Sequence, residues 1–223
     1  MSFNLAVCTQ PKCRYNYVRV SGPELTEIKA NTFMDIVFST IEISYTNLVH
    51  IHPDAFMDTY NTTDTLYIRN NPQLEPDTIY NVMSKFTNAT FIEEYHNAKF
   101  TMMPANAFSN SKQSKLKRLH IWSSETTIGS HAISSLYSLR YIMFGGPVNH
   151  IMANAFAIDR PMFHPFYMEN ELNTIDFKGN KGFDCQDCRF NLAVCTQPKC
   201  PDNYVRVSGP ERNTTLWLYG LSI

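Results

Sequence analysis

The chain has 223 residues, with 19 Lys and Arg against 20 Asp and Glu, so its formal net charge is −1. Its only basic cluster is the short run from Lys112 to Arg118, and it lacks the continuous basic stripe that strong nucleic-acid binding needs. A nucleic-acid partner is therefore not expected. No run of about 18 apolar residues occurs, so no transmembrane helix is expected either.

Short alternating apolar pairs occur along the chain. Alternation with a period of two predicts a short strand with one buried face. The pairs are Val18 and Val20, Ile41 and Ile43, Leu66 and Ile68, Leu119 and Ile121, and Tyr141 and Met143. In the unit between 93 and 108 this alignment places Glu93 at a buried position, which leaves the register of that unit open by one residue.

A second pattern, apolar-x2-apolar-x4-Phe, follows the pairs at a period of about 25 residues, which is typical of solenoids. It occurs at residues 25–33, 48–56, 100–108 and 148–156. Stacked units of this kind bury apolar sides that one unit cannot bury alone. The pattern predicts a spine of aromatic packing from Phe33, Phe56, Phe108 and Phe156.

The combined unit resembles the leucine-rich repeat over roughly 17–180, or about seven units. The resemblance implies an α/β solenoid of the horseshoe type, with a parallel concave sheet and an irregular or short-helical convex side. The irregular units also look similar to arthropod extracellular leucine-rich proteins. The asparagine ladder of the family is mostly missing: Asn71 and Asn170 fall in register, but the other units offer Pro23, Thr46, Ala98, Ser124 and Gly146.

The cysteines lie only near the two ends, as Cys8, Cys13, Cys185, Cys188, Cys195 and Cys200. Extracellular members of the family close their arrays with disulfide caps, so the resemblance implies disulfides in a secreted protein or an ectodomain, although no signal peptide is visible. Zinc bound by the last four thiolates, in a cytoplasmic protein, is the alternative. The expected domains are a partial N-terminal cysteine cap at 1–17, repeats at 18–180, a cysteine-rich cap at 181–203 and a duplicated segment or tail at 204–223.

Two segments of the chain are nearly identical. Phe3–Glu24 and Phe190–Glu211 agree at 20 of 22 positions and differ only at Arg14/Pro201 and Tyr15/Asp202. Either a cap-encoding segment was duplicated recently and begins another array, or the chain is a fragment or a mis-joined gene model. The absence of a signal peptide favours the second interpretation.

Side chains flanking the buried pairs are expected to face outward on the concave sheet. In chain order they are Tyr17, Arg19, Ser21, Thr40, Glu42, Ser44, Thr65, Tyr67, Arg69, Glu94, His96, Arg118, His120, Trp122, Arg140, Ile142 and Phe144. Trp, Tyr and Arg are enriched at binding hot spots. The partner-binding residues predicted from this set are Tyr67, Arg69, His96, Arg118, His120, Trp122, Arg140 and Phe144. Local packing of Trp122 and Phe144 is the alternative.

No catalytic motif is present, so no enzyme activity and no cofactor are expected. We expect a non-enzymatic recognition module that binds a protein or glycan partner on its concave face. A non-catalytic accessory subunit of a secreted enzyme complex and an intracellular zinc or thiol scaffold are the alternatives. His50 and His52 are expected in a solvated loop rather than at a metal. Asn61, Asn88 and Asn213 are N-glycosylation sequons if the chain is secreted.

Overall fold

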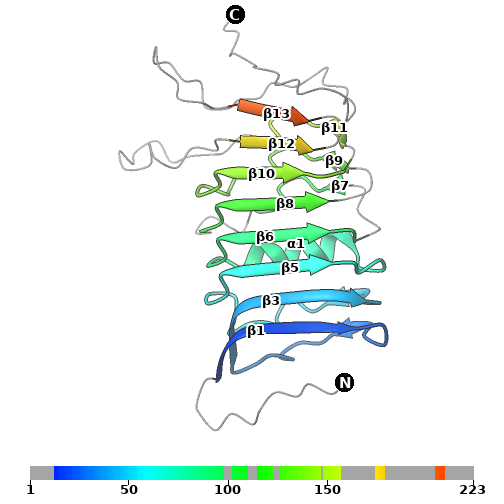
Figure 1. Ribbon diagram of the computed structural model, residues 1–223, viewed down its shortest axis with the longest axis vertical. Coiled ribbons are helices and arrows are strands. Elements are labelled where there is room, and N and C mark those ends of the chain that lie inside the picture. The colour runs from blue at the N-terminus through cyan, green and yellow to red at the C-terminus, as the bar shows by residue number, and fades with distance from the viewer. Residues whose placement is uncertain are drawn as a thin grey trace, which may run out of the picture.

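The computed structural model describes residues 13–97, 102–109, 115–122, 126–146, 148–156, 174–178 and 204–208. Over these residues the chain forms a solenoid whose turns stack along one axis, with one strand of each turn in a common sheet (Figure 1). The predicted α/β solenoid is therefore confirmed.

In the part of the chain that the structure describes, the main sheet has eight strands, and every neighbouring pair in it is parallel. Its order is β1 (Cys13–Gly22), β3 (Ile36–Thr46), β5 (Thr65–Arg69), β6 (Phe91–Tyr95), β8 (Arg118–Trp122), β10 (Tyr141–Phe144), β12 (Thr174–Lys178) and β13 (Tyr204–Ser208). Because consecutive turns contribute consecutive strands, residues about 25 positions apart become neighbours on one face.

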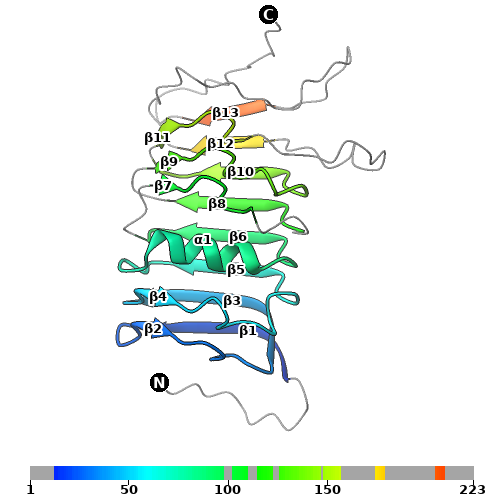
Figure 2. The ribbon, with the colours of Figure 1, turned by 180° about the vertical axis from the view of Figure 1, so that it is seen from behind.

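Within the described residues, the opposite side of the solenoid is built from much shorter strands and one helix (Figure 2). The strands form two small parallel sheets, β2 (Glu27–Ile28) with β4 (His50–Ile51), and β7 (Met102–Met103) with β9 (Thr126–Ile128) and β11 (Val148–Ile151). Helix α1 (Pro76–Lys85) lies between them. It begins with a proline, which suits the first helical turn because that turn needs no N–H donor.

An aromatic spine runs through the core, as the repeated Phe predicts. Phe33 and Phe56 stack with ring centroids 4.7 Å apart. Near α1 the repeated Phe rings contact rings from the helix region. The ring centroid of Phe56 lies 5.9 Å from that of Phe86, and the ring centroid of Phe108 lies 5.9 Å from that of Tyr80 in the helix. All four predicted Phe side chains are buried. Each ring removes about 150–250 Å² from water, so the spine is a main source of stability.

Two strands have the opposite phase to the one predicted. In β6 the buried side chains are Ile92 and Glu94, and Glu93 faces outward. In β10 the register aligns Ile142 with Leu119 and Phe144 with Ile121, so these two side chains face the core, while Met143 is buried as expected, at 8% exposed, but lies on the outward side. The assignment of Glu94, Ile142 and Phe144 to the outward face was therefore wrong, because a shift of one residue moves every side chain of a strand to the other face.

A partial asparagine ladder joins the turns after β3, β5 and β6. The backbone N–H and the hydroxyl of Thr46 donate to Asn71 Oδ1, at 3.2 and 2.7 Å. In the next turn the backbone N–H of Asn71 donates to Asn97 Oδ1 at 2.8 Å. Asn97 therefore fills the ladder position that the sequence alignment had given to Ala98. The one-residue register error of this turn explains the difference.

Glu94 continues the ladder beyond Asn97. Its Oε1 accepts from the backbone N–H and the Nδ2 of Asn97, at 3.2 and 2.8 Å, and its Oε2 accepts from the backbone N–H of Trp122 at 3.1 Å. A buried carboxylate thus takes the place of the amide that the next turn would supply. Burial raises the pKa of Glu94 to about 8, against the opposing effect of these hydrogen bonds.

The residue before each ladder position has a left-handed backbone. These residues are Tyr45, Asn70 and His96, with φ of 54°, 53° and 53°. The conformation lets the next residue turn its N–H toward the ladder acceptor. Asn and His are enriched in this conformation, whereas Tyr adopts it at some cost.

No helix in the described residues is long and apolar enough to cross a membrane. Cys13 is the first residue of β1, so the paired strand extends into the segment assigned to the N-terminal cap. The other five cysteines lie outside the described residues.

Candidate partner-binding surface

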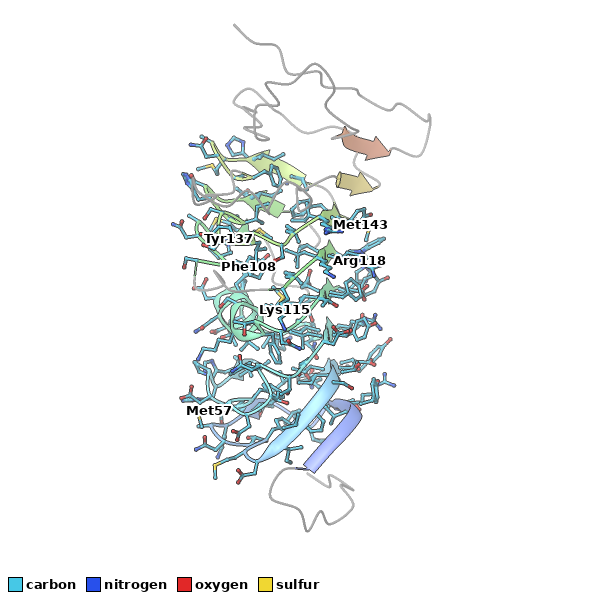
Figure 3. All side chains as sticks on the ribbon, turned by 90° about the vertical axis from the view of Figure 1, so that its left-hand side faces the viewer. Met57, Phe108, Lys115, Arg118, Tyr137 and Met143 are labelled. Carbon is cyan, nitrogen blue, oxygen red and sulfur yellow. The ribbon has the colours of Figure 1, made fainter. Side chains whose placement is uncertain are left out.

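The outward side of the main sheet carries three rows of side chains, which we call the outer sheet face. It corresponds to the predicted concave face. The rows run Tyr17, Thr40, Thr65, Phe91, Arg118 and Tyr141; then Arg19, Glu42, Tyr67, Glu93, His120 and Met143; then Ser21, Ser44, Arg69, Tyr95 and Trp122. Figure 3 shows the sheet from its edge, with Arg118 and Met143 on the sheet side and Met57 on the opposite side of the solenoid.

The first polar cluster on this face lies over β1 and β3. Arg19 Nε donates to Ser44 Oγ at 3.1 Å and lies 3.4 Å from Glu42 Oε1. Ser44 Oγ donates to the same carboxylate at 2.8 Å, and the Tyr17 hydroxyl donates to its other oxygen. Burial opposes ionisation of Glu42, but these hydrogen bonds and the charge of Arg19 lower its pKa. The carboxylate is thus fully engaged within the protein.

The second polar cluster lies at the centre of the face, over β5, β6 and β8. Arg69 Nε donates to Glu93 Oε1 at 2.6 Å, and His120 Nδ1 lies 3.6 Å from Glu93 Oε2. Burial raises the pKa of Glu93, but His120 and Arg69 outweigh it, so the net shift is downward. Glu93 therefore lies between Arg69 and His120 and fixes the positions of both side chains.

Aromatic rings surround this central cluster. The Phe91 ring lies edge-to-face with Tyr67 at 5.7 Å and with His120 at 4.7 Å. Arg69 lies over the Tyr67 ring at 4.0 Å, and Arg118 lies over the Phe91 ring at 5.8 Å. These contacts link three neighbouring strands into one aromatic and cationic patch whose rings support each other.

Trp122 borders the patch and is half-buried. Its indole lies 5.4 Å from the Tyr95 ring, and it occupies the space that a side chain at Gly145 would fill, since a Cβ there would come within 2.1 Å of the ring. His96 stacks on Tyr95 with centroids 4.0 Å apart. The local packing considered as the alternative for Trp122 is therefore present, and it leaves part of the indole on the surface.

The structure brings five of the eight predicted binding residues together on the outer sheet face, namely Tyr67, Arg69, Arg118, His120 and Trp122. His96 follows β6 and is exposed beyond the strand end. Arg140 is exposed and directly precedes β10, at the phase of the buried Ile142. Phe144 is only 1% exposed and belongs to the core, so its prediction as a surface contact was wrong.

Five residues of the face escaped the sequence analysis. They are Phe91, Glu93, Tyr95, Tyr141 and Met143. Alignment of Asn97 with Asn71 would have revealed the first three, because it sets the phase of β6. No comparable polar marker sets the phase of β10.

The remaining candidate residues have structural roles where they are described. His50 is the first residue of β4, so its assignment to a loop was wrong, and its Nδ1 lies 3.2 Å from Thr78 Oγ1. The backbone N–H of Asp54 donates to His52 Nδ1 at 3.1 Å. No group of three metal-ligating side chains occurs among the described residues. Asn61 accepts from the Thr87 hydroxyl, and Asn88 accepts from Lys115 Nζ.

Asn213 lies outside the described residues, as do residues 112–114, the beginning of the basic run that ends at Arg118. The sequon at Asn213 therefore remains a sequence-based prediction.

A comparison with protein families decides the classification. The model of the BspA type leucine rich repeat region matches residues 26–161 in six copies, which is more than half of the 223-residue chain. The chain belongs to the BspA-type leucine-rich repeat family. The family supports a role in protein interaction, and it agrees with the ladder and the parallel sheet described above. No match was found among curated proteins.

Proposed function

We propose that this leucine-rich repeat protein is a non-enzymatic recognition module that binds a protein partner on its outer sheet face. The observation that carries the proposal is the contiguous patch of Tyr67, Phe91 and His120 with Arg69 and Arg118 beside it. Aromatic and Arg side chains dominate binding hot spots because they offer large, rigid contact areas with a polar group attached.

Charge on the patch indicates what the partner presents. Glu93 already counters Arg69, whereas Arg118 is exposed and meets no carboxylate in the described part of the chain. An Arg that stacks on an aromatic ring keeps its guanidinium N–H groups free for a carboxylate. The partner should therefore place an acidic side chain against Arg118 and an apolar group against the neighbouring rings.

A differential capture experiment tests this proposal. Wild-type protein, a Tyr67→Ala/Arg118→Ala variant and a Met57→Ala control are immobilised and exposed to extract from the source organism. Met57 is also exposed, but lies on the opposite side of the solenoid. The proposal expects a protein that binds the wild type and the control, and whose purified form binds the double variant at least about tenfold more weakly.

Two outcomes contradict it. Equal binding to the double variant and the wild type places the interaction elsewhere. Loss of capture after glycosidase treatment of the extract identifies a glycan instead of a protein surface.

We also propose that the protein works outside the cell, with its cysteines in disulfides. The support is the confinement of all six cysteines to the ends of the array. The test is alkylation of the denatured, non-reduced protein followed by intact mass measurement. No alkylated thiol is expected, while six alkylated thiols or bound zinc would favour the cytoplasmic scaffold.

A further inference from the structure

The same pentapeptide forms both terminal strands of the main sheet. Tyr-Val-Arg-Val-Ser occurs at Tyr17–Ser21 within β1 and again at Tyr204–Ser208, which is β13. These strands lie at opposite ends of the eight-stranded sheet (Figure 1). The same strand sequence therefore pairs through one edge in β1, with β3, and through the opposite edge in β13, with β12.

The two pairings have matching geometry. In β13, Tyr204 is in register with Thr174 and Ser208 with Lys178 of β12. In β1, the corresponding Tyr17 is in register with Thr40 of β3. Both pairs are parallel, and both continue the same direction of stacking. A strand of this sequence can thus lie between a β12-like neighbour and a β3-like neighbour.

The two copies nevertheless differ in length as strands. β1 has 10 residues and begins at Cys13, whereas β13 has 5 and begins at Tyr204. The only two sequence differences between the copies are Arg14/Pro201 and Tyr15/Asp202, and Arg14 and Tyr15 are strand residues of β1. Proline has no N–H to donate to a ladder, and aspartate is disfavoured in strands. The copy that closes the C-terminal end is therefore the weaker strand.

We propose that β1 of a second copy of this chain replaces β13 on β12 and joins the two molecules head to tail in one continuous sheet. The replacement exchanges identical residues at the five paired positions, so the new contacts match those given up. In the described part of the chain, the second edge of β1 carries no strand, and an open strand edge is a template for pairing. The contact joins different ends of the two molecules, so it leaves a free end at each side and growth stays open.

The covalent connection between β12 and β13 determines how readily β1 of a second molecule can replace β13. β13 is joined to β12 within the same chain through residues 179–203, so its pairing with β12 is intramolecular and has an effective concentration on the order of mM. Wild-type protein should therefore associate only at high concentration. Weakening β13 should lower the concentration at which association begins, and strengthening β13 should raise it.

Two full-length variants shift the competition in opposite directions. Val205→Asp/Val207→Asp places charges at the positions that correspond to the buried Val18 and Val20 of β1. Pro201→Arg/Asp202→Tyr makes the second copy identical to the first over the whole duplicated segment. Sedimentation velocity from about 10 µM to 1 mM should show association of the first variant at a concentration at least about tenfold below that of wild type. The second variant should associate less than wild type.

A peptide distinguishes strand exchange from general stickiness. The cysteine-free peptide 14–24 contains the β1 copy of the strand and should cap the open β12 of the Val205→Asp/Val207→Asp variant, which returns it to monomers. The matched control peptide carries Val18→Asp and Val20→Asp. A variant that stays monomeric over the whole range overturns the proposal, and so does association that both peptides affect equally.

Discussion

The carboxylate of Glu94 accepts a hydrogen bond from the backbone N–H of Trp122, 28 residues further along the chain, at 3.1 Å. The same side chain accepts two hydrogen bonds from Asn97. One buried acidic residue thus connects the asparagine ladder to the turn that presents Trp122 and His120 on the outer sheet face. The surface patch and the interior ladder are parts of one hydrogen-bonded unit.

Glu94 should make the stability of the protein depend on pH. Burial raises its pKa to about 8, above the unfolded value near 4.5. The folded state therefore binds more protons than the unfolded state between these values, and stability should fall as the pH rises from about 5 to 8, at a limiting slope of about 1.4 kcal/mol per pH unit. Urea unfolding of wild type and Glu94→Gln at several pH values tests this, because the Gln variant lacks the titrating group.

The difference between the two proteins isolates the contribution of Glu94, because every other ionisable group is present in both. Parallel stability curves for wild type and Glu94→Gln between pH 5 and pH 8 would contradict the raised pKa. Glu42 and Glu93 should not add to the pH dependence between pH 5 and pH 8, because their pKa values are lowered from the ordinary value of a glutamate.

Removal of the Asn97 side chain should destabilise the solenoid strongly. Its amide accepts from the backbone N–H of Asn71 and donates to Ile68 O and Glu94, all in a fully buried position. Asn97→Ala leaves several buried groups without partners, at about 1–3 kcal/mol for each unsatisfied group. Asn47→Ala is the matched control, because Asn47 is exposed and makes one hydrogen bond to Pro23 O.

Chemical unfolding should give a loss of at least about 2 kcal/mol for Asn97→Ala and less than about 1 kcal/mol for the control. Equal losses in the two variants would show that the ladder does not hold the turns together.

The sequence predicted the solenoid because the alternating pairs and the Phe spacing depend only on apolar character, which burial requires. It failed in β10 for a physical reason: Tyr141, Ile142, Met143 and Phe144 are all apolar, so either phase of the strand satisfies the pattern. It failed in β6 because a core position is held by Glu94, and only its ladder contacts make that burial tolerable.

The wrong phases of β6 and β10 also misplaced residues of the predicted binding surface. Residues on β5 and β8 were placed correctly, since their pairs Leu66 and Ile68, and Leu119 and Ile121, allow only one phase. Alignment of Asn97 with Asn71 places Phe91 on the face, but its contacts with Tyr67 and His120 became visible only when the register with β5 and β8 was known. Aromatic contacts across strands depend on that register, and no spacing within a single unit contains it.

Gly145 should be required for the position of Trp122. A Cβ at this residue would lie 2.1 Å from the indole, so Gly145→Ala must push the ring away from its place. We expect a red-shifted Trp emission and a loss of stability of about 1–3 kcal/mol from overpacking. A Trp217→Phe background leaves Trp122 as the only emitting indole.

A double-mutant cycle checks the cause. In a Trp122→Ala background the same Gly145→Ala change has no ring to displace, so its cost should largely disappear. An undiminished cost would mean that the backbone of Gly145, rather than the indole, is what the substitution disturbs.

Tyr45 and Asn70 both have a left-handed backbone, and the single substitutions Tyr45→Asn and Asn70→Tyr should change the stability in opposite directions. Both have φ near +54° at equivalent positions, directly before the ladder residues Thr46 and Asn71. Tyr45 is 60% exposed, so little packing is lost on its replacement. Asn relieves part of the left-handed cost of about 1–2 kcal/mol per residue, so Tyr45→Asn should raise the free energy of unfolding by about 0.5–1 kcal/mol. Asn70→Tyr should lower it by a similar amount. Thermal and urea unfolding measure both, and a fall in stability for Tyr45→Asn would show that the contact of its ring with Arg19 outweighs the backbone cost.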